Sequence, residues 1–143
     1  MTKKKEDAMI LSQERIAQDI YSMWIRTEAA RTAVPGQFIS MYTNDGSKLL
    51  PRPISICEIN KADESLRVVY RVTGENTGTK LFSQMKAGDT VPVIGPLGNG
   101  FPHEKAEGKK AFLIGGGIGV PPILELAKQM KCEKKQIIVC MYR

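Results

Sequence analysis

The sequence is poor in residues that ligate metals and in aromatic residues that stack on nucleic-acid bases. Its 143 residues include three cysteines, one histidine and one tryptophan, and aromatic residues make up 6%. The cysteines, Cys57, Cys132 and Cys140, are odd in number and match no common zinc or iron–sulfur spacing. We therefore expect no disulfide framework and no metal site. Cys57 and Cys140 lie in apolar runs and are expected to be small core residues.

The chain also lacks an apolar run long enough to cross a membrane. Lys3, Lys4 and Lys5 near its start are not followed by the apolar stretch of a secretory signal. These absences predict a cytoplasmic protein that is not held in a membrane.

Acidic residues are fewer than basic ones. The chain has 21 Lys and Arg residues and 15 Asp and Glu residues, which give a formal net charge of +6. The lysines are scattered and form no basic stripe interleaved with aromatic residues, as nucleic-acid binding would favour. A basic nucleic-acid-binding barrel is an alternative, but it would need exposed aromatic residues for stacking. We expect no nucleic-acid partner, although a modest positive field would help to hold phosphate-bearing ligands.

The first hundred residues show the alternation of apolar and polar residues that is typical of β-strands, interrupted by residues that favour turns. Apolar and polar residues alternate in short segments, and Pro35–Gly36 marks a turn. The expected strands cover residues 7–13, 19–27, 34–43, 53–59, 65–72 and 89–95. Six such strands predict a small antiparallel barrel or sandwich.

One helix interrupts the strands, over residues 76–88, with Leu81, Phe82 and Met85 on one side and Gly88 as its C-cap. Its start, Gly78–Thr79, could offer backbone N–H groups and a positive dipole end to an anion. Plain capping by a threonine explains the same residues equally well.

The pattern changes after residue 101. Residues 111–115 and 136–142 are apolar runs typical of strands buried on both faces, and residues 120–130 form an amphipathic helix between them. This βαβ unit predicts a parallel sheet. We expect a barrel domain over residues 1–101, a linker over 102–109 that carries a surface histidine, His103, and an α/β domain from 110 to 143. Two strands and one helix cannot cover both faces of a sheet, so we expect the front part of a longer protein.

A glycine-rich turn, "GGGIG" at residues 115–119, links the first of these strands to the helix. It does not match the dinucleotide fingerprint G-x-G-x-x-G, because residue 120 is Val. A tight turn is one explanation. Four glycines in five residues exceed what one turn needs, which favours a phosphate-bearing ligand.

Three motifs then stand in order: "RPIS" at 52–55, "GT" at 78–79 and "GGGIGVPP" at 115–122. Together they resemble the ferredoxin–NADP reductase superfamily. The resemblance implies a six-stranded Greek-key FAD-binding barrel followed by the start of a nucleotide-binding α/β domain. It also implies that the Arg52 guanidinium forks onto the FAD pyrophosphate, while Ser55 lies beside the flavin ring. The flanking prolines, Pro51 and Pro53, would fix the backbone between them.

Three longer segments narrow the resemblance to one family within this superfamily. They are "GPLGNGF" at 95–101, "RPISICEIN" at 52–60 and "VVYRVTGENTGTKLFSQMKAGD" at 68–89, and they look like the electron-transfer subunit of class B dihydroorotate dehydrogenase. In that family these segments supply the cofactor contacts. Carried over, the FAD contacts are Arg52, Pro53, Ile54, Ser55, Val69, Tyr70, Arg71, Gly78 and Thr79, and the nicotinamide-nucleotide contacts are Gly115, Gly116, Gly117 and Gly119.

The function that the resemblance implies is electron transfer from NADH to FAD, then to a [2Fe–2S] centre and to an FMN-containing catalytic subunit within a heterotetramer. That subunit interconverts dihydroorotate and orotate in pyrimidine biosynthesis. The three cysteines do not stand in for the family's cluster ligands, so the FAD site looks whole, the NAD site half built and the iron–sulfur site absent. Related flavin subunits of sulfhydrogenases and of NADH-dependent ferredoxin:NADP oxidoreductases, and a non-catalytic FAD-binding fragment, are alternatives.

Overall fold

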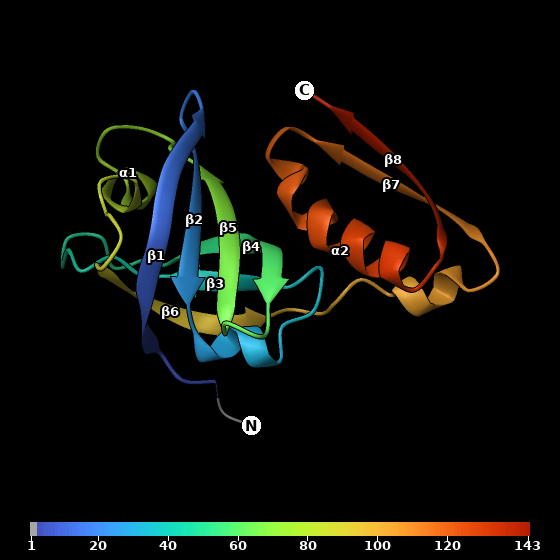
Figure 1. The fold of residues 1–143 in the computed structure, drawn as a ribbon. Coiled ribbons are helices and arrows are strands. Elements are labelled where there is room, and N and C mark those ends of the chain that lie inside the picture. Colours follow the sequence, from blue (N-terminus) through green and yellow to red (C-terminus); the bar gives the residue numbers. More distant parts are fainter. Residues whose placement is uncertain (1–2) are drawn as a thin grey trace.

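The computed structural model describes residues 3–143 as a β-barrel followed by a βαβ unit (Figure 1). The barrel strands are β1 (Glu6–Ala17), β2 (Ile20–Arg26), β3 (Phe38–Met41), β4 (Arg52–Asn60), β5 (Ser65–Arg71) and β6 (Thr90–Leu97). They close in the order β1-β2-β5-β4-β3-β6, and every pairing is antiparallel. Strand β6 returns beside β3 after the run β3-β4-β5, which is the Greek-key connection that the family resemblance implies.

The barrel interior is filled by the residues that alternate inward along each strand. Met23 and Ile25 of β2 and Leu66 and Val68 of β5 are fully buried, as the period-two pattern requires. Tyr70 is also buried, with its ring 5.9 Å from that of Tyr21 in a stacked arrangement. The part of the core that the strands supply therefore follows their alternation.

A short helix, α1 (Gly78–Ser83), closes one end of the barrel (Figure 1). Phe82 points into the core and meets the Tyr70 ring edge-on at 6.2 Å. The Gln13 side chain of β1 donates to the carbonyl oxygens of Phe82 and Met85, at 2.8 and 2.7 Å, and accepts from the Tyr70 hydroxyl at 2.6 Å. One glutamine thus ties the end of α1 to two strands.

The predicted helix over residues 76–88 is too long. Helix α1 ends at Ser83 with Gln84 as its C-cap, because the chain then turns back to β6. Gly88 does not cap the helix. It has a φ of +92°, and its N–H donates to the Ile10 carbonyl at 2.9 Å, which fixes the turn before β6.

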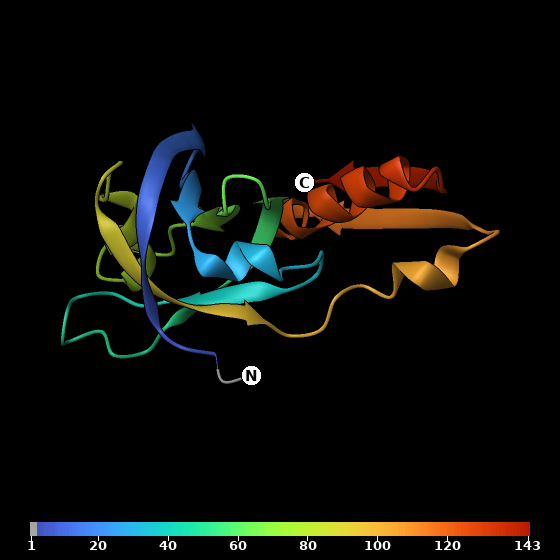
Figure 2. The same cartoon turned by 60° about the horizontal axis from the view of Figure 1, so that its bottom comes forward.

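The βαβ unit consists of β7 (Lys110–Gly116), α2 (Pro121–Cys132) and β8 (Gln136–Tyr142), and its two strands are parallel as expected. Figure 2 shows the connection from the barrel, in which the predicted linker contains a 3₁₀ turn, His103–Ala106. Helix α2 packs Leu126 and Met130 against Leu113 of β7. The domain boundaries at residues 101 and 110 remain predictions.

The two apolar strands are not buried on both faces, as their composition alone suggested, but one face is open, as expected for a sheet of two strands and one helix. Helix α2 covers one face, and among the described residues no element covers the other. Phe112 and Ile114 of β7 are accordingly 61% and 62% exposed, and most of β8 is exposed as well. Cys140 lies on this open sheet and is not a core residue, whereas Cys57 is buried as expected.

Between residues 3 and 143, no helix has both the length and the apolar composition needed to cross a membrane.

Gly36 provides a test of the contact between the β3 entry and the segment that leaves β6. Its φ is +100°, and an added Cβ would lie 2.8 Å from the Phe101 backbone nitrogen. We expect Gly36→Ala to lower the free energy of unfolding by roughly 1–3 kcal/mol, because both the φ and the space oppose a side chain. Urea unfolding measures this loss. Gly46→Ala is the matched control, since nothing lies within 4 Å of its added Cβ, and equal losses in the two variants would contradict the explanation.

Candidate functional site

Arg52, at the start of β4, lies directly against the first residue of α1. A Cβ built on Gly78 would be 3.3 Å from the Arg52 Nε atom and 3.2 Å from the Thr43 methyl carbon. Gly78 is buried, so its missing side chain makes room for the arginine. The structure thereby brings together two predicted site residues that are 26 positions apart in the sequence.

The start of α1 combines capping with free donors. Thr77 is the N-cap, and its hydroxyl accepts from the Lys80 N–H at 3.3 Å. Within residues 3–143, the N–H groups of Gly78 and Thr79 have no hydrogen-bond acceptor. The capping explanation is therefore correct for Thr77, and it still leaves two amide donors beside Arg52. The buried Thr79 hydroxyl is occupied, because it accepts from the Thr73 N–H at 3.2 Å.

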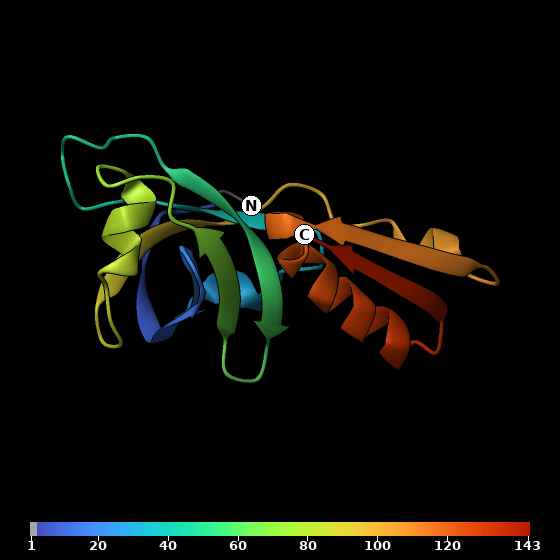
Figure 3. The same cartoon turned by 90° about the horizontal axis from the view of Figure 1, so that it is seen from above.

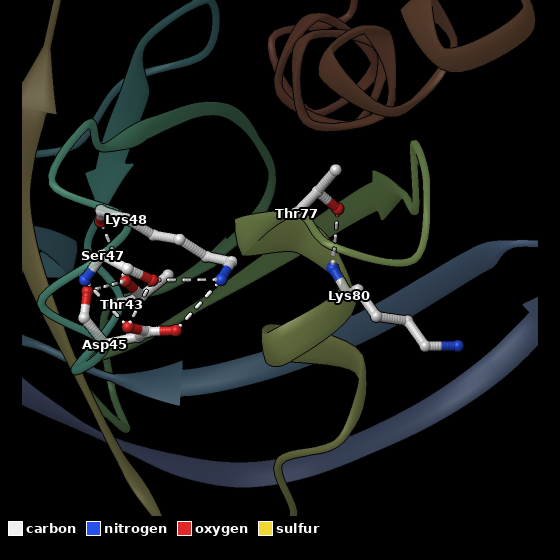
Figure 4. Close-up of polar contacts among 6 residues, drawn as sticks. All are labelled: Thr43, Asp45, Ser47, Lys48, Thr77 and Lys80. Atoms are coloured by element: carbon white, nitrogen blue, oxygen red, sulfur yellow. Dashed lines mark hydrogen bonds and ion pairs between the residues drawn. The ribbon is translucent and has the colours of Figure 1, made fainter.

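The β3–β4 loop next to this helix start is braced by its own polar groups (Figure 4). The Asp45 carboxylate accepts from the Ser47 N–H and hydroxyl at 2.8 and 2.7 Å, and its other oxygen lies 3.0 Å from Lys48 Nζ. The hydrogen bonds from Ser47, followed by that from Lys48, lower the pKa of Asp45 to about 2. The Asp45 carboxylate is therefore charged at neutral pH and forms an ion pair with Lys48.

Arg52 differs from the lysines around it. Lys48 pairs with Asp45, and Lys80 pairs with Glu75 at 3.3 Å. In the part of the chain that the structure describes, the Arg52 guanidinium has no hydrogen bond and no ion pair, although the backbone of this residue pairs with β3. An unpaired guanidinium beside two free amide N–H groups makes a site with the right donors for a doubly charged anion such as a pyrophosphate.

Alternation divides the other predicted site residues between the two faces of the β4–β5 sheet. Ser55 and Arg71 are exposed, and Val69 lies on the same outer face as Arg71. Ile54 and Tyr70 instead point into the barrel, where both contact the core. A ligand on the outer face can meet Ile54 and Tyr70 only through their backbone. Burial, reinforced by the neighbouring Tyr21, raises the pKa of the Tyr70 phenol, so this group stays protonated.

An apolar cavity of about 530 Å³ opens between this outer face and the βαβ unit. On the barrel side it is lined by Cys57, Arg67 and Val69, and on the other side by the start of α2 and by Val139 and Met141 of β8. Its size lies in the range of small-molecule sites. Burial raises the pKa of the Cys57 thiol to about 11, so this cysteine is a neutral wall residue and not a nucleophile.

The glycine-rich turn lies at the α2 end of this cavity, and the structure explains most of its glycines locally. A Cβ on Gly115 would be 3.2 Å from the Val120 backbone, and one on Gly116 would be 2.5 Å from the Tyr142 ring. Gly117 has a φ of +55°. Gly119 alone has neither a positive φ nor any atom within 4 Å of an added Cβ. Local packing therefore leaves only Gly119 in need of another reason.

The start of α2 itself is a weak anion site. Pro121 and Pro122 occupy its first two positions and have no N–H, and the Ile123 N–H donates to the Val120 carbonyl at 3.0 Å. A phosphate at this turn would have to use the amides of residues 117–119, before the helix.

Sequence reasoning missed four residues that shape the site. Gln13 anchors α1, Cys57 and Arg67 line the cavity, and Thr43 packs on Gly78. Gln13 and Arg67 are ordinary polar residues in alternating strands, and no local signal marks them. Cys57 could have been found, because it lies two residues after Ser55 and so faces the same side of β4.

No group of His, Cys, Asp and Glu residues between positions 3 and 143 has the arrangement needed to hold a metal ion.

Comparison with known proteins identifies close relatives. No family model matches the sequence. The chain is 47% identical over 131 residues to the electron transfer subunit of dihydroorotate dehydrogenase B (NAD(+)) from Streptococcus mutans, covering 91% of this chain and 50% of the relative. It is 41% identical over 140 residues to the subunit of the same name from Enterococcus faecalis, covering 96% and 52%. The chain thus spans about half the length of these relatives.

Solved structures share the architecture. An NADH-dependent reduced ferredoxin-NADP oxidoreductase matches with a TM-score of 0.81 and 26% identity, over 95% of this chain and 48% of that one. Phthalate dioxygenase reductase matches with a TM-score of 0.74 and 25% identity, over 96% and 43%. The ferredoxin reductase of carbazole 1,9a-dioxygenase, at 22% identity and a TM-score of 0.83, supports the fold alone.

The barrel, the βαβ unit and the sequence matches agree, and the chain is therefore a homologue, over about half of their length, of the electron transfer subunits of dihydroorotate dehydrogenase B, with the fold of the ferredoxin reductases.

Proposed function

We propose that this chain binds FAD and carries electrons between NADH and the catalytic subunit of a dihydroorotate dehydrogenase. The observation that carries the proposal is the unpaired Arg52 guanidinium held against Gly78, beside the free N–H groups of Gly78 and Thr79. These groups supply donors for a pyrophosphate and have no partner among the described residues. The names of the relatives, which are electron transfer subunits, point to the same function.

The residues present fit both the pyrophosphate and the ring system of FAD. The anion site stands at the start of β4, and the apolar cavity begins at Cys57, five residues further along the same strand. At a rise of about 3.3 Å per residue these points are roughly 17 Å apart, which suits a ligand with a pyrophosphate and a ring joined by an extended chain. The exposed Ser55 lies between them on the outer face. A neighbour with 20% identity is described with bound FAD and NADP.

The protein's part in this function is to bind, orient and shield. Arg52 and the α1 amides would hold the pyrophosphate, and the backbone of Val69, Tyr70 and Arg71 would line the ring. FAD, when bound, supplies the ability to accept a hydride and release electrons one at a time. The apolar walls of the cavity would keep water from the ring.

The nicotinamide nucleotide is proposed to approach the glycine-rich turn. Gly119 is the residue whose lack of a side chain no local contact explains, and it directly precedes Val120, which lines the cavity. This position would bring a nicotinamide towards a flavin ring that lies on β4 and β5. The FMN-containing partner, the heterotetramer, the [2Fe–2S] centre, the role in pyrimidine biosynthesis and the cytoplasmic location remain predictions from the resemblance.

A second candidate is the flavin subunit of a ferredoxin:NADP oxidoreductase, favoured by the match to the NADH-dependent enzyme of that class. The FAD site would be the same, and only the electron partner would differ. The higher identity to dihydroorotate dehydrogenase subunits, 47% against 26%, favours the first candidate.

The direct test is an absorbance spectrum of the purified chain after incubation with FAD and removal of excess. We expect flavin bands, and mass spectrometry of the compound released on denaturation should identify FAD. A chain that remains colourless and does not quench FAD fluorescence on titration would contradict the proposal.

Arg52→Lys tests the anion site. Lysine keeps the positive charge but loses the planar fork, so we expect the dissociation constant for FAD to rise about tenfold with unchanged thermal stability. FAD fluorescence titration measures this constant. Arg26→Lys, at an exposed position on β2, is the matched control. Equal dissociation constants for FAD in the two variants would show that Arg52 does not contribute to the site.

Gly119→Ala tests the nucleotide turn. The new methyl group meets no protein atom within 4 Å, so we expect the free energy of unfolding to change by less than about 0.5 kcal/mol. NADH binding, followed by its fluorescence, should weaken severalfold, because the methyl group occupies the space through which the ligand approaches. Unchanged NADH affinity, or no NADH binding by the parent chain, would refute this assignment.

A further inference from the structure

The contact between the barrel and the βαβ unit has an unusual composition. The buried core of the barrel and the cluster around Leu113, Leu126 and Met130 are separate, and the latter faces β7 and β8. Helix α2 nevertheless lies along β4, as Figures 1 and 3 show from two directions. No continuous hydrophobic core therefore joins the two parts.

Polar side chains supply the hydrogen bonds and ion pairs across the contact. Strand β4 pairs with β3 only as far as Ser55, and beyond that point the Ile59 N–H donates to the Glu125 carboxylate of α2 at 3.0 Å. Lys128, three residues further along α2, donates to Glu58 at 3.2 Å and lies 3.7 Å from Glu125. A helix carboxylate thus satisfies a strand amide, as another strand would do in a longer sheet.

Glu58 extends this contact into the barrel wall. Its other carboxylate oxygen accepts from Arg67 at 2.9 Å, and Arg67 also donates to the Ser22 hydroxyl at 2.8 Å. Burial acts to raise the pKa of Glu58, but hydrogen bonds from Arg67 and Lys128 outweigh it and lower the pKa below the ordinary value. Glu58 is therefore charged at neutral pH and can hold both cations.

The packing on either side of these contacts is incomplete. The apolar cavity of about 530 Å³ lies on one flank of α2, and a second cavity of about 360 Å³ lies on the other, between α2 and residues 33–35. The Gln129 amide oxygen, beside the second cavity, is buried without a hydrogen-bond donor among residues 3–143. Two cavities and an unsatisfied acceptor indicate that close packing does not hold this interface shut.

We propose that Glu125 and Lys128 form a polar latch that holds α2 and the glycine-rich turn over the outer face of β4, and that breaking the latch opens the apolar cavity while the barrel stays folded. The two are positioning residues: they set the distance between the walls that carry Val69 and Val120. Two structural units can move relative to each other unless the interface between them is large and hydrophobic. The consequence for electron transfer rests on the proposed function, whereas the latch itself does not.

Cys57 offers a reporter for opening. Its side chain lines the cavity under α2 and only 3% of the residue is exposed, so movement of α2 away from β4 should increase the access of a reagent to the thiol. Its raised pKa further suppresses reaction in the closed state. Cys132→Ser and Cys140→Ser, both at exposed positions, leave Cys57 as the only thiol in the chain.

The experiment measures the rate of alkylation of Cys57 by iodoacetamide in this background, without added cofactor. We expect Glu125→Ala to raise the rate about tenfold, because it removes a charged acceptor from a backbone N–H. Lys128→Met should raise it roughly two- to fivefold, since this ion pair is half exposed. Glu125→Gln keeps an acceptor oxygen and should stay near the parent rate. Lys131→Met, which removes an exposed lysine of the same helix, is the control.

Hydrogen exchange distinguishes local opening from unfolding. With the latch broken, the Ile59 amide should exchange faster while the amide of Val68, in the barrel core, keeps its protection. Alkylation rates equal to that of Lys131→Met would overturn the proposal. Parallel acceleration at Ile59 and Val68 would also overturn it, because the barrel would then be unfolding as a whole. Neither outcome depends on FAD, so failure here is distinct from failure of the proposed function.

Discussion

The anchoring of α1 to the open end of the barrel is the constraint on which the candidate site depends. A six-residue helix has little stability of its own, so tertiary contacts must hold it. Phe82 inserts into the core, and Gln13 bonds two carbonyls at the end of the helix and the hydroxyl of Tyr70. These contacts fix where the helix begins, and therefore place Gly78 against Arg52. The anion site is a consequence of how the barrel is closed.

Apolar contacts stabilise each part of the chain internally, whereas polar contacts join the two parts. Each part of the chain has its own hydrophobic cluster, and the junction between the parts relies on Glu58, Glu125 and Lys128. A hydrophobic junction would stabilise one orientation more strongly, at the expense of motion. The cavity proposed to hold the flavin ring lies at this junction. Its two walls belong to different parts, so their separation depends on directional polar contacts.

Much of the architecture could be predicted because it rests on local patterns. Alternation located the six strands, and the glycine-rich turn between two apolar runs located the βαβ unit. Apart from the overlong helix at 76–88, the predictions that failed concern the burial of residues and not the position of segments. Apolar runs indicate that Phe112, Ile114 and Cys140 avoid water, but burial depends on neighbouring elements, and one helix covers one face only.

The sequence by itself determined the order of the elements, because strand period, proline restraint and helix-start chemistry act over a few residues. The motif residues Arg52, Ser55, Gly78 and Thr79 came from the resemblance of their motifs to a known family. The tertiary structure alone decided which of them meet. It placed Arg52 without an anionic partner, turned the Tyr70 side chain inward, and brought Glu125 to the Ile59 amide. These pairings join residues far apart in the chain, and they arise from barrel closure and helix docking, which no short segment encodes.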